Sequence, residues 1–296
     1  MQKTFSKSKQ KRGKLKTYFK LFNAWITAGV SIANLIKLTK ISVSSKQLLR
    51  YFYAFLDRSP KHKKLNIPQH INLKVDAKYF GELGCTIVFK EKRNIIYWDF
   101  VENETYQTYI ESFNKLTELG YIIDSVTSDK HRAIVSSVRD LFPNIPHQYC
   151  MVHIQRSCET YLTKNPETIA GQKLLEIVKF TNQIKTETEK GVFLAWLTRY
   201  ENEWKTFINQ KTYPTSLGLN EKPWYTHKNL RKAFRILKSS QNNMFFYLDN
   251  LNIPKDTNGL EAEFTHLKSK TNAHRGLLQK RVINFVNWYW FFKSKK

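Results

Sequence analysis

The order of short apolar runs between residues 71 and 154 constrains the fold of this chain more than any other feature. Strand-like runs are separated by turns, and later runs alternate with segments of helical spacing. The expected strands are 71–80, 84–90, 94–101, 121–127 and 148–154, and the expected helices are 104–119 and 130–142. Strands that alternate with helices join a sheet in parallel, whereas strands joined by tight turns run antiparallel. The sequence therefore predicts a mixed sheet.

The predicted fold class is α/β, because three strands followed by alternating helices and strands form the βββαβαβ order of a ribonuclease-H-like core. Helical spacing from about residue 160 to 255 predicts an all-α insertion into that core. A helical, helix-turn-helix-like domain is expected before it. The expected segments are a disordered basic arm (1–16), the helix-turn-helix-like domain (17–58), a linker (59–69), the first part of the core (70–159), the insertion (160–255) and the last part of the core (256–296).

The chain is strongly basic, with 49 Lys and Arg residues against 24 Asp and Glu and a formal net charge of +25. Residues 1–70 carry 16 of the basic residues and one acid, Asp57. Such a clustered excess favours a polyanionic partner, most commonly nucleic acid. Three cysteines are too few for a disulfide framework, which fits a cytoplasmic protein. The uncharged stretch 21–36 is short and interrupted by polar residues, so no membrane association is expected.

Two short helices are expected in the N-terminal domain, at 31–38 and 44–56, with a tight turn between them. Ser44 or Ser45 would cap the second helix. In a helix-turn-helix, polar residues at the start of the second helix face DNA. The expected DNA-facing residues are Ser44, Ser45, Lys46 and Arg50. A helical hairpin that only packs against the core is the alternative.

Three carboxylates occupy informative positions. Asp76 lies in the middle of the first strand, Asp129 follows the strand 121–127, and Glu261 lies near the start of a helix at 258–268. An acid on an inner strand is costly unless a cation or hydrogen bonds compensate it. Brought together by the fold, three carboxylates would form an oxygen-only site for Mg²⁺ or Mn²⁺. With the basic charge, this pattern favours metal-dependent chemistry on nucleic acid phosphodiesters.

Each acid also has a structural interpretation. The polar face that carries Asp76 could belong to an exposed edge strand. Asp129 could be the N-cap of the helix 130–142. Glu261 could be a first-turn acid that interacts favourably with the helix dipole. Glu263, two residues later, is expected to point elsewhere and serves as a control.

A fourth motif, Cys150-Met-Val-His153, lies at the last expected strand. Cysteine and histidine at this spacing can bind zinc, with His147 or Cys158 as a further ligand. Two ligands alone are a weak zinc signal, so a supporting role without zinc is the preferred hypothesis.

These residues together resemble a family. The ordered set Asp76, Asp129, Cys150-x-x-His153 and Glu261 is similar to that of bacterial insertion-sequence transposases related to Mutator-like (MULE) elements. The short sequence segments around these residues are also similar to those of the family: Val-Asp-Ala, Thr-Ser-Asp, Gln-Tyr-Cys-Met-Val-His and Thr-Asn-Gly-Leu-Glu. The resemblance covers roughly residues 65–296. Relatives often carry a cysteine-rich zinc ribbon near the N-terminus, whereas the first cysteine here is Cys85.

The resemblance implies a DDE transposase with two Mg²⁺ or Mn²⁺ ions. Asp76 would bridge both ions, and Asp129 and Glu261 would bind one each. The site would nick the element end and then let the freed 3′-OH attack target DNA. Cys150 and His153 would support the site without binding the catalytic metals.

The resemblance also implies partners. They are double-stranded DNA, in the form of element ends and target, and a second copy of the chain in a synaptic complex associated with the bacterial nucleoid. Further DNA contacts are expected from Lys130, His131, Arg132, Trp224, Lys268 and Arg275. Of Trp196, Trp204 and Trp224 in the insertion, one could stack on an unpaired base, but the preferred interpretation is that they fill the insertion's own core, with Trp224, beside Pro223 in a loop, as the best exception. The alternatives are a structure-selective DNA nuclease of the same fold and a decayed transposase that only binds DNA.

Overall fold

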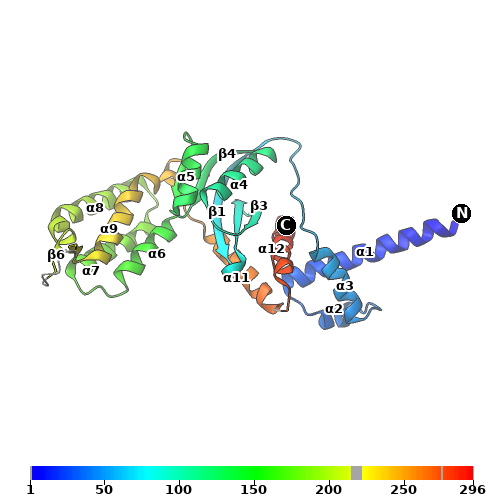
Figure 1. Ribbon diagram of the computed structural model, residues 1–296. Helices are drawn as coiled ribbons and strands as arrows, with labels where there is room; N and C mark the ends of the chain where they lie inside the picture. The colour runs from blue at the N-terminus through cyan, green and yellow to red at the C-terminus, as the bar shows by residue number, and fades with distance from the viewer. Residues whose placement is uncertain (1, 215–221, 275, 296) are drawn as a thin grey trace. The chain divides into compact units, whose positions relative to one another are not determined.

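The computed structural model describes residues 2–214, 222–274 and 276–295, and the chain divides into two compact units (Figure 1). The first unit contains Met1–His70, Val75–Ile122 and Gly259–Lys296, and the second contains Ile71–Lys74 and Ile123–Asn258. None of the helices in the described part of the chain combines the length and the apolar character that crossing a membrane requires.

A five-stranded mixed sheet has the strand order β3-β2-β1-β4-β5. Strands β2 and β3 are antiparallel, whereas β4 and β5 are parallel. The strands are β1 (Gln69–Tyr79), β2 (Cys85–Glu91), β3 (Asn94–Val101), β4 (Tyr121–Ser128) and β5 (His147–Tyr149), with a 3₁₀ turn at Gly81–Leu83. The α/β class, the mixed sheet and the order of its strands along the chain are therefore as predicted.

Strand β1 lies between β2 and β4, so it is an interior strand of the sheet. Its residues alternate, because Ile71, Leu73 and Val75 are buried whereas the residues between them are half-buried. Asp76 belongs to the half-buried face. The interpretation of that face as an exposed edge strand is therefore wrong.

Three helices form the N-terminal part of the first unit: α1 (Gln2–Ala28), α2 (Ile32–Thr39) and α3 (Ser45–Leu56). The expectation of a disordered arm over 1–16 does not match, because residues 2–16 continue helix α1. The second half of α1 is anchored by buried Phe22 and Ile26, and a nucleated helix extends readily through a sequence without proline. Helices α2 and α3 agree with the predicted pair, and Ser44 caps α3 by accepting a hydrogen bond from the Gln47 amide at 3.2 Å.

The core of the first unit is rich in aromatic residues. Helix α12 (Gln279–Lys293) packs against β3, α1 and α3 (Figure 1). Trp290 is fully buried, and its indole donates a hydrogen bond to the Thr86 hydroxyl on β2 at 3.1 Å. Helices α4 (Tyr106–Glu118) and α11 (Asn258–Ala273) complete the set of this unit's helices in the described ranges. Gly120 follows α4 with φ of 100°, as expected for the residue that ends a helix.

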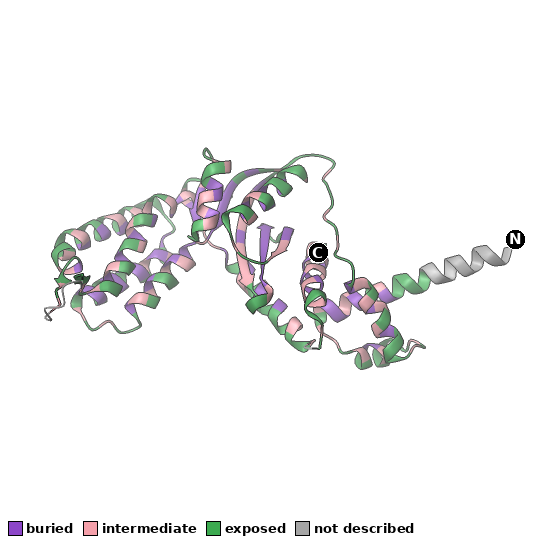
Figure 2. Cartoon of the chain, in the orientation of Figure 1, coloured by how far each residue is buried: buried purple, intermediate pink, exposed green. Residues whose placement is uncertain are grey.

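The second unit is mainly helical, and Figure 2 shows buried residues along the facing sides of its helices. It contains α5 (Arg132–Leu141), α6 (Met151–Leu162), α7 (Ile169–Phe180), α8 (Glu187–Ile208), α9 (Lys228–Ser240) and α10 (Phe246–Asp249), with 3₁₀ turns at Thr181–Gln183 and Gln241–Asn243. A two-stranded sheet of β6 (Lys211–Thr212) and β7 (Trp224–Tyr225) interrupts them, so the insertion is not wholly helical.

The last strand is shorter than predicted. Strand β5 ends at Tyr149, and helix α6 starts two residues later, so the predicted strand 148–154 is wrong after Tyr149. Met151, Ile154, Cys158 and Leu162 are buried at helical spacing and pack into the core of the second unit. Cys150 is thus the N-cap residue of α6, and His153 lies in its first turn.

Candidate active site

Asp129 directly follows the last residue of β4 and is half-buried. Its Oδ1 accepts a hydrogen bond from the His131 backbone amide at 3.1 Å, and His131 is the N-cap residue of α5. Asp129 therefore stabilises the turn that leads into α5, although it is not the N-cap that the structural interpretation expected. Polar residues after strand ends commonly form the active sites of α/β proteins.

Asp129 and His153 line the same cavity of about 300 Å³ in the second unit. The remaining lining residues are Lys130, His131, Ile154, Ser157 and Ile236. The structure thus brings together two of the motifs that the sequence separates by 24 positions, and it does so at the end of β4.

Beside this cavity, Cys150, His153 and Thr257 form a buried polar cluster. The Thr257 hydroxyl lies 3.5 Å from the Cys150 sulfur and 3.4 Å from His153 Nδ1, and the Thr257 amide donates to the same sulfur at 3.4 Å. Burial alone would raise the pKa of Cys150, but hydrogen bonds from His153 and Thr257 outweigh it and lower the pKa. The cluster therefore favours negative charge on the sulfur.

Further hydrogen bonds fix the segment that precedes helix α11. The Thr127 hydroxyl donates to the Pro254 carbonyl at 2.8 Å, and the Met151 amide donates to the Lys255 carbonyl at 3.3 Å. We call this hydrogen-bonded cluster the clasp. One side of it consists of Thr127, Cys150, Met151 and His153, and the other side consists of residues 254–257. Every residue of the clasp belongs to the second unit. The clasp therefore attaches the chain just before α11 to the ends of β4 and β5.

Glu261 is in the first turn of α11, four residues after Thr257. Leu260, Phe264 and Leu267 form the buried stripe of this helix, and Glu261 is half-buried beside it. Glu263 instead forms an ion pair with Lys293 at 3.0 Å and accepts a hydrogen bond from the Tyr289 hydroxyl at 3.4 Å. Both of these partners of Glu263 belong to helix α12.

Asp76 belongs with Glu261 to the first unit, whereas Asp129 belongs to the second. Asp76 Oδ1 accepts a hydrogen bond from the Ala77 amide at 2.9 Å. Within residues 2–214, 222–274 and 276–295, no three His, Cys, Asp or Glu side chains form a group that could hold a metal ion. By chemistry the three acids fit Mg²⁺ or Mn²⁺, because carboxylate oxygens are the ligands that these ions prefer.

The zinc hypothesis for Cys150-x-x-His153 gains no support from its proposed further ligands. His147 Nε2 lies 2.9 Å from the Ser128 hydroxyl, and burial lowers the pKa of His147 to about 4. The Cys158 thiol points to the Ala233 carbonyl at 3.6 Å. Both side chains therefore have other partners.

Most of the residues expected to contact DNA are exposed. Ser44, Ser45, Lys46 and Arg50 are exposed at the start of α3, as are His131, Arg132 and Lys268 on their own elements. Trp224 is 51% exposed on β7, whereas Trp204 packs against the insertion core. Arg275 lies outside the described residues.

Lys130 has partners within the protein. Its Nζ donates to the hydroxyls of Ser239 and Ser240, at 2.6 and 3.1 Å, and lies 5.7 Å from the ring centre of Tyr149. Burial lowers the pKa of Lys130. This lysine joins the end of β4 to helix α9, a role that the sequence did not indicate.

Comparison with known proteins agrees with the motifs. Residues 83–211 match the family model described as "Transposase, Mutator family". Two transposases for the insertion sequence element IS256 in transposon Tn4001, from Staphylococcus aureus and Enterococcus faecalis, are each 32% identical to this chain over 91 residues. That match covers 30% of this chain and 23% of each relative, so it spans less than a quarter of their length.

Among solved structures, the Drosophila P element transposase strand transfer complex has a TM-score of 0.42 at 12% identity, over 93% of this chain and 92% of that one. A likeness at that level does not establish a shared fold. The family model and the IS256 relatives agree with the resemblance drawn from the four motifs, and residues 83–211 of this chain are similar to transposases of the Mutator family.

Proposed function

We propose that this chain is a DNA transposase with a ribonuclease-H-like core, and that it cleaves and joins DNA with Asp76, Asp129 and Glu261. The observation that carries the proposal is local to the second unit. Asp129 shares a cavity with His153, and the clasp beside it leads directly into the helix that carries Glu261. Asp129 and His153 thus line one cavity, and Glu261 follows the clasp four residues after Thr257.

Asp76, Asp129 and Glu261 would together bind two Mg²⁺ or Mn²⁺ ions. When bound, such ions activate an attacking water or hydroxyl and stabilise the oxygen that leaves the phosphorus. The carboxylates supply the negative charge that attracts the ions, and their backbone attachments limit how far they move. Cys150 and His153 act through Thr257 to position the start of α11, and they do not bind the metal.

The basic residues of the chain would contact two kinds of DNA, the element ends and the target. At least two copies of the chain would form the active assembly, which would be associated with the nucleoid. Helix α3 is proposed to read the element ends through Ser44, Ser45, Lys46 and Arg50. Trp224, which is exposed on β7, is proposed to stack on an unpaired base near the cleaved end.

The deciding experiment is a strand-transfer assay with DNA from both ends of the element that encodes this chain, in Mg²⁺ or Mn²⁺ and in EDTA. Joined products that require the metal are expected. Cleavage without joining would instead indicate a structure-selective nuclease. End binding without any metal-dependent product would indicate a decayed transposase.

Replacing both Lys46 and Arg50 with glutamine is expected to weaken binding to element ends about tenfold, because each basic side chain contributes a phosphate or base contact. Both side chains are exposed, so the thermal unfolding temperature should stay unchanged. Binding is measured by fluorescence anisotropy. The control replaces Lys179 and Lys205, which are exposed on α7 and α8, with glutamine. Equal losses in both variants would contradict a specific role for α3.

A further inference from the structure

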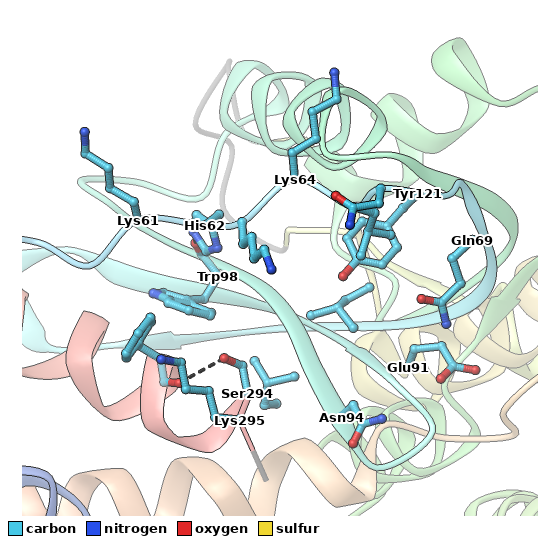
Figure 3. Close-up of a pocket in the computed structure, with 16 residues that line it drawn as sticks. Lys61, His62, Lys64, Gln69, Glu91, Asn94, Trp98, Tyr121, Ser294 and Lys295 are labelled. Carbon is cyan, nitrogen blue, oxygen red and sulfur yellow. Dashed lines mark hydrogen bonds between the residues drawn. The ribbon is translucent and has the colours of Figure 1, made fainter. Parts of the chain in front are cut away.

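A second site lies in the first unit, between the linker that precedes β1, the edge strand β3 and the end of α12. Figure 3 shows this cavity, which has a volume of about 640 Å³. We call it the linker pocket, and the residues that line it include Lys61, Lys63, Lys64, Gln69, Tyr121 and Lys295. A volume of this size is typical of sites for small organic ligands.

The linker is fixed to the rest of the first unit although it has no regular secondary structure. His62 Nε2 lies 3.0 Å from the Trp98 carbonyl, and its ring packs against Tyr97 and Trp98 with centroid distances of 4.4 and 4.3 Å. The amides of Leu65 and Gln69 donate to the carbonyls of Leu119 and Gly120, at 2.8 and 3.0 Å. The walls of the pocket are therefore held before any ligand binds, which reduces the entropy cost of binding.

The pocket is strongly basic. Lys61, Lys63, Lys64 and Lys295 line it, against a single acid, Glu91. Glu91 is largely buried, and Lys92 lies 3.7 Å from its carboxylate. Burial lowers the pKa of His62 more than its hydrogen bond to Trp98 raises it, so the lysines supply the positive charge near neutral pH. In Figure 3 the side chains of Lys61 and Lys64 extend away from the other lining residues, so part of this positive charge lies along the rim of the pocket. Lysine charge around the pocket attracts a phosphate-bearing ligand.

The lining also includes an aromatic and an amide side chain. Tyr121 is half-buried with its side chain on the pocket, and Gln69 is labelled beside it in Figure 3. Aromatic rings stack on nucleobases, and side-chain amides donate to and accept from base edges. A duplex presents its phosphates outward and needs no pocket, whereas an unpaired nucleotide presents both a phosphate and a free base.

We propose that the linker pocket binds an unpaired nucleotide of a DNA strand, with the base against Tyr121 and Gln69 and the phosphate at the lysines. The inference rests on the proposed function only in that DNA is the partner. No metal or catalysis is involved, so binding is tested in EDTA, where a failure of strand transfer has no bearing on the result.

The first test is photocrosslinking of the full chain to an oligothymidylate that carries one 5-iododeoxyuridine, followed by peptide mapping. A crosslink to the peptide that contains Tyr121 or Trp98 is expected. Excess free thymidine monophosphate should compete if the pocket takes free nucleotides, and only unlabelled oligothymidylate should compete if it needs a strand. Crosslinks confined to other peptides, such as one with Trp224, would overturn the proposal.

The second test measures affinity for oligothymidylate and for blunt duplex DNA. Replacing Tyr121 with leucine should weaken single-strand binding about tenfold and leave duplex binding unchanged, whereas replacing it with phenylalanine should preserve both, because a ring is retained. Equal affinity of the leucine and phenylalanine variants would refute stacking.

The third test replaces Lys61, Lys63 and Lys64, all three at once, by glutamine. The slope of log affinity for single-stranded DNA against log salt concentration should become shallower by about one to two units, since each lost phosphate contact removes about 0.7. Lys164, Lys179 and Lys205 are exposed lysines of the second unit, and their triple glutamine variant is the charge-matched control. An equal change in both variants would show a general charge effect and refute the site.

Discussion

Replacing Asp129 with asparagine is expected to lower strand transfer at least about a thousandfold while DNA binding and the thermal unfolding temperature change little. Asparagine keeps the shape of the side chain and an oxygen that accepts the His131 amide, so the turn into α5 should survive. It removes the negative charge that a divalent ion needs, and charge stabilisation by such an ion is worth several kcal/mol in the transition state. Asp76→Asn and Glu261→Gln should show the same loss. Product formation is followed on gels with labelled end DNA.

Glu263→Gln is the matched control for Glu261→Gln, because both residues are on α11 and both changes remove one charge. Glu263 forms an ion pair with Lys293, so its loss should affect stability slightly and catalysis little. Glutamine is preferable to alanine here because it preserves an acceptor for the Tyr289 hydroxyl. Strand transfer that survives in Glu261→Gln but not in Glu263→Gln would mean that the third acid is wrongly assigned.

Replacing Thr257 with valine in a Cys150→Ala background is expected to lower strand transfer about a hundredfold and to raise the metal concentration needed for half-maximal rate. The two changes remove the contacts of the Thr257 hydroxyl with the sulfur and with His153, while the size of residue 257 is retained. Groups that orient metal ligands without binding the metal typically contribute ten- to a hundredfold to affinity or activity. The measurement is a metal titration of the strand-transfer rate.

Thr257→Ser provides the control, because serine keeps the hydroxyl and should retain most of the activity. A purely structural clasp would lower the amount of folded protein without changing the metal requirement of the folded fraction. An unchanged half-saturating metal concentration in the double variant would therefore contradict the positioning role of the clasp.

Local sequence patterns predicted most of the regular structure. The alternation around Asp76 and the helical spacing of 104–119 and 44–56 each depend on which face of one element is apolar, and that information lies within a few residues. Ser44 marked the start of a helix for the same reason, because capping is a short-range effect. The Mutator-family resemblance likewise depended on short motifs and their order, and residues 83–211 confirm it.

Local patterns were misleading where distant residues decide the outcome. Residues 150–154 are apolar enough for a strand, yet they form the first turn of α6, because Met151 and Ile154 pack into the core of the second unit. For Lys130 local patterns gave no indication of the serines, more than a hundred positions later, that accept its hydrogen bonds. Neither partner is visible in the neighbouring sequence.

The sequence by itself determined most of the elements, the mixed sheet and the choice of Asp76, Asp129, Cys150, His153 and Glu261. Periodicity, caps and the order of motifs can all be recognised from neighbouring residues along the chain. Only the tertiary structure identified Thr127 and Thr257 as parts of the clasp and assembled the linker pocket. Both depend on hydrogen bonds and cavity walls from segments far apart in sequence, and chain folding alone brings such groups together.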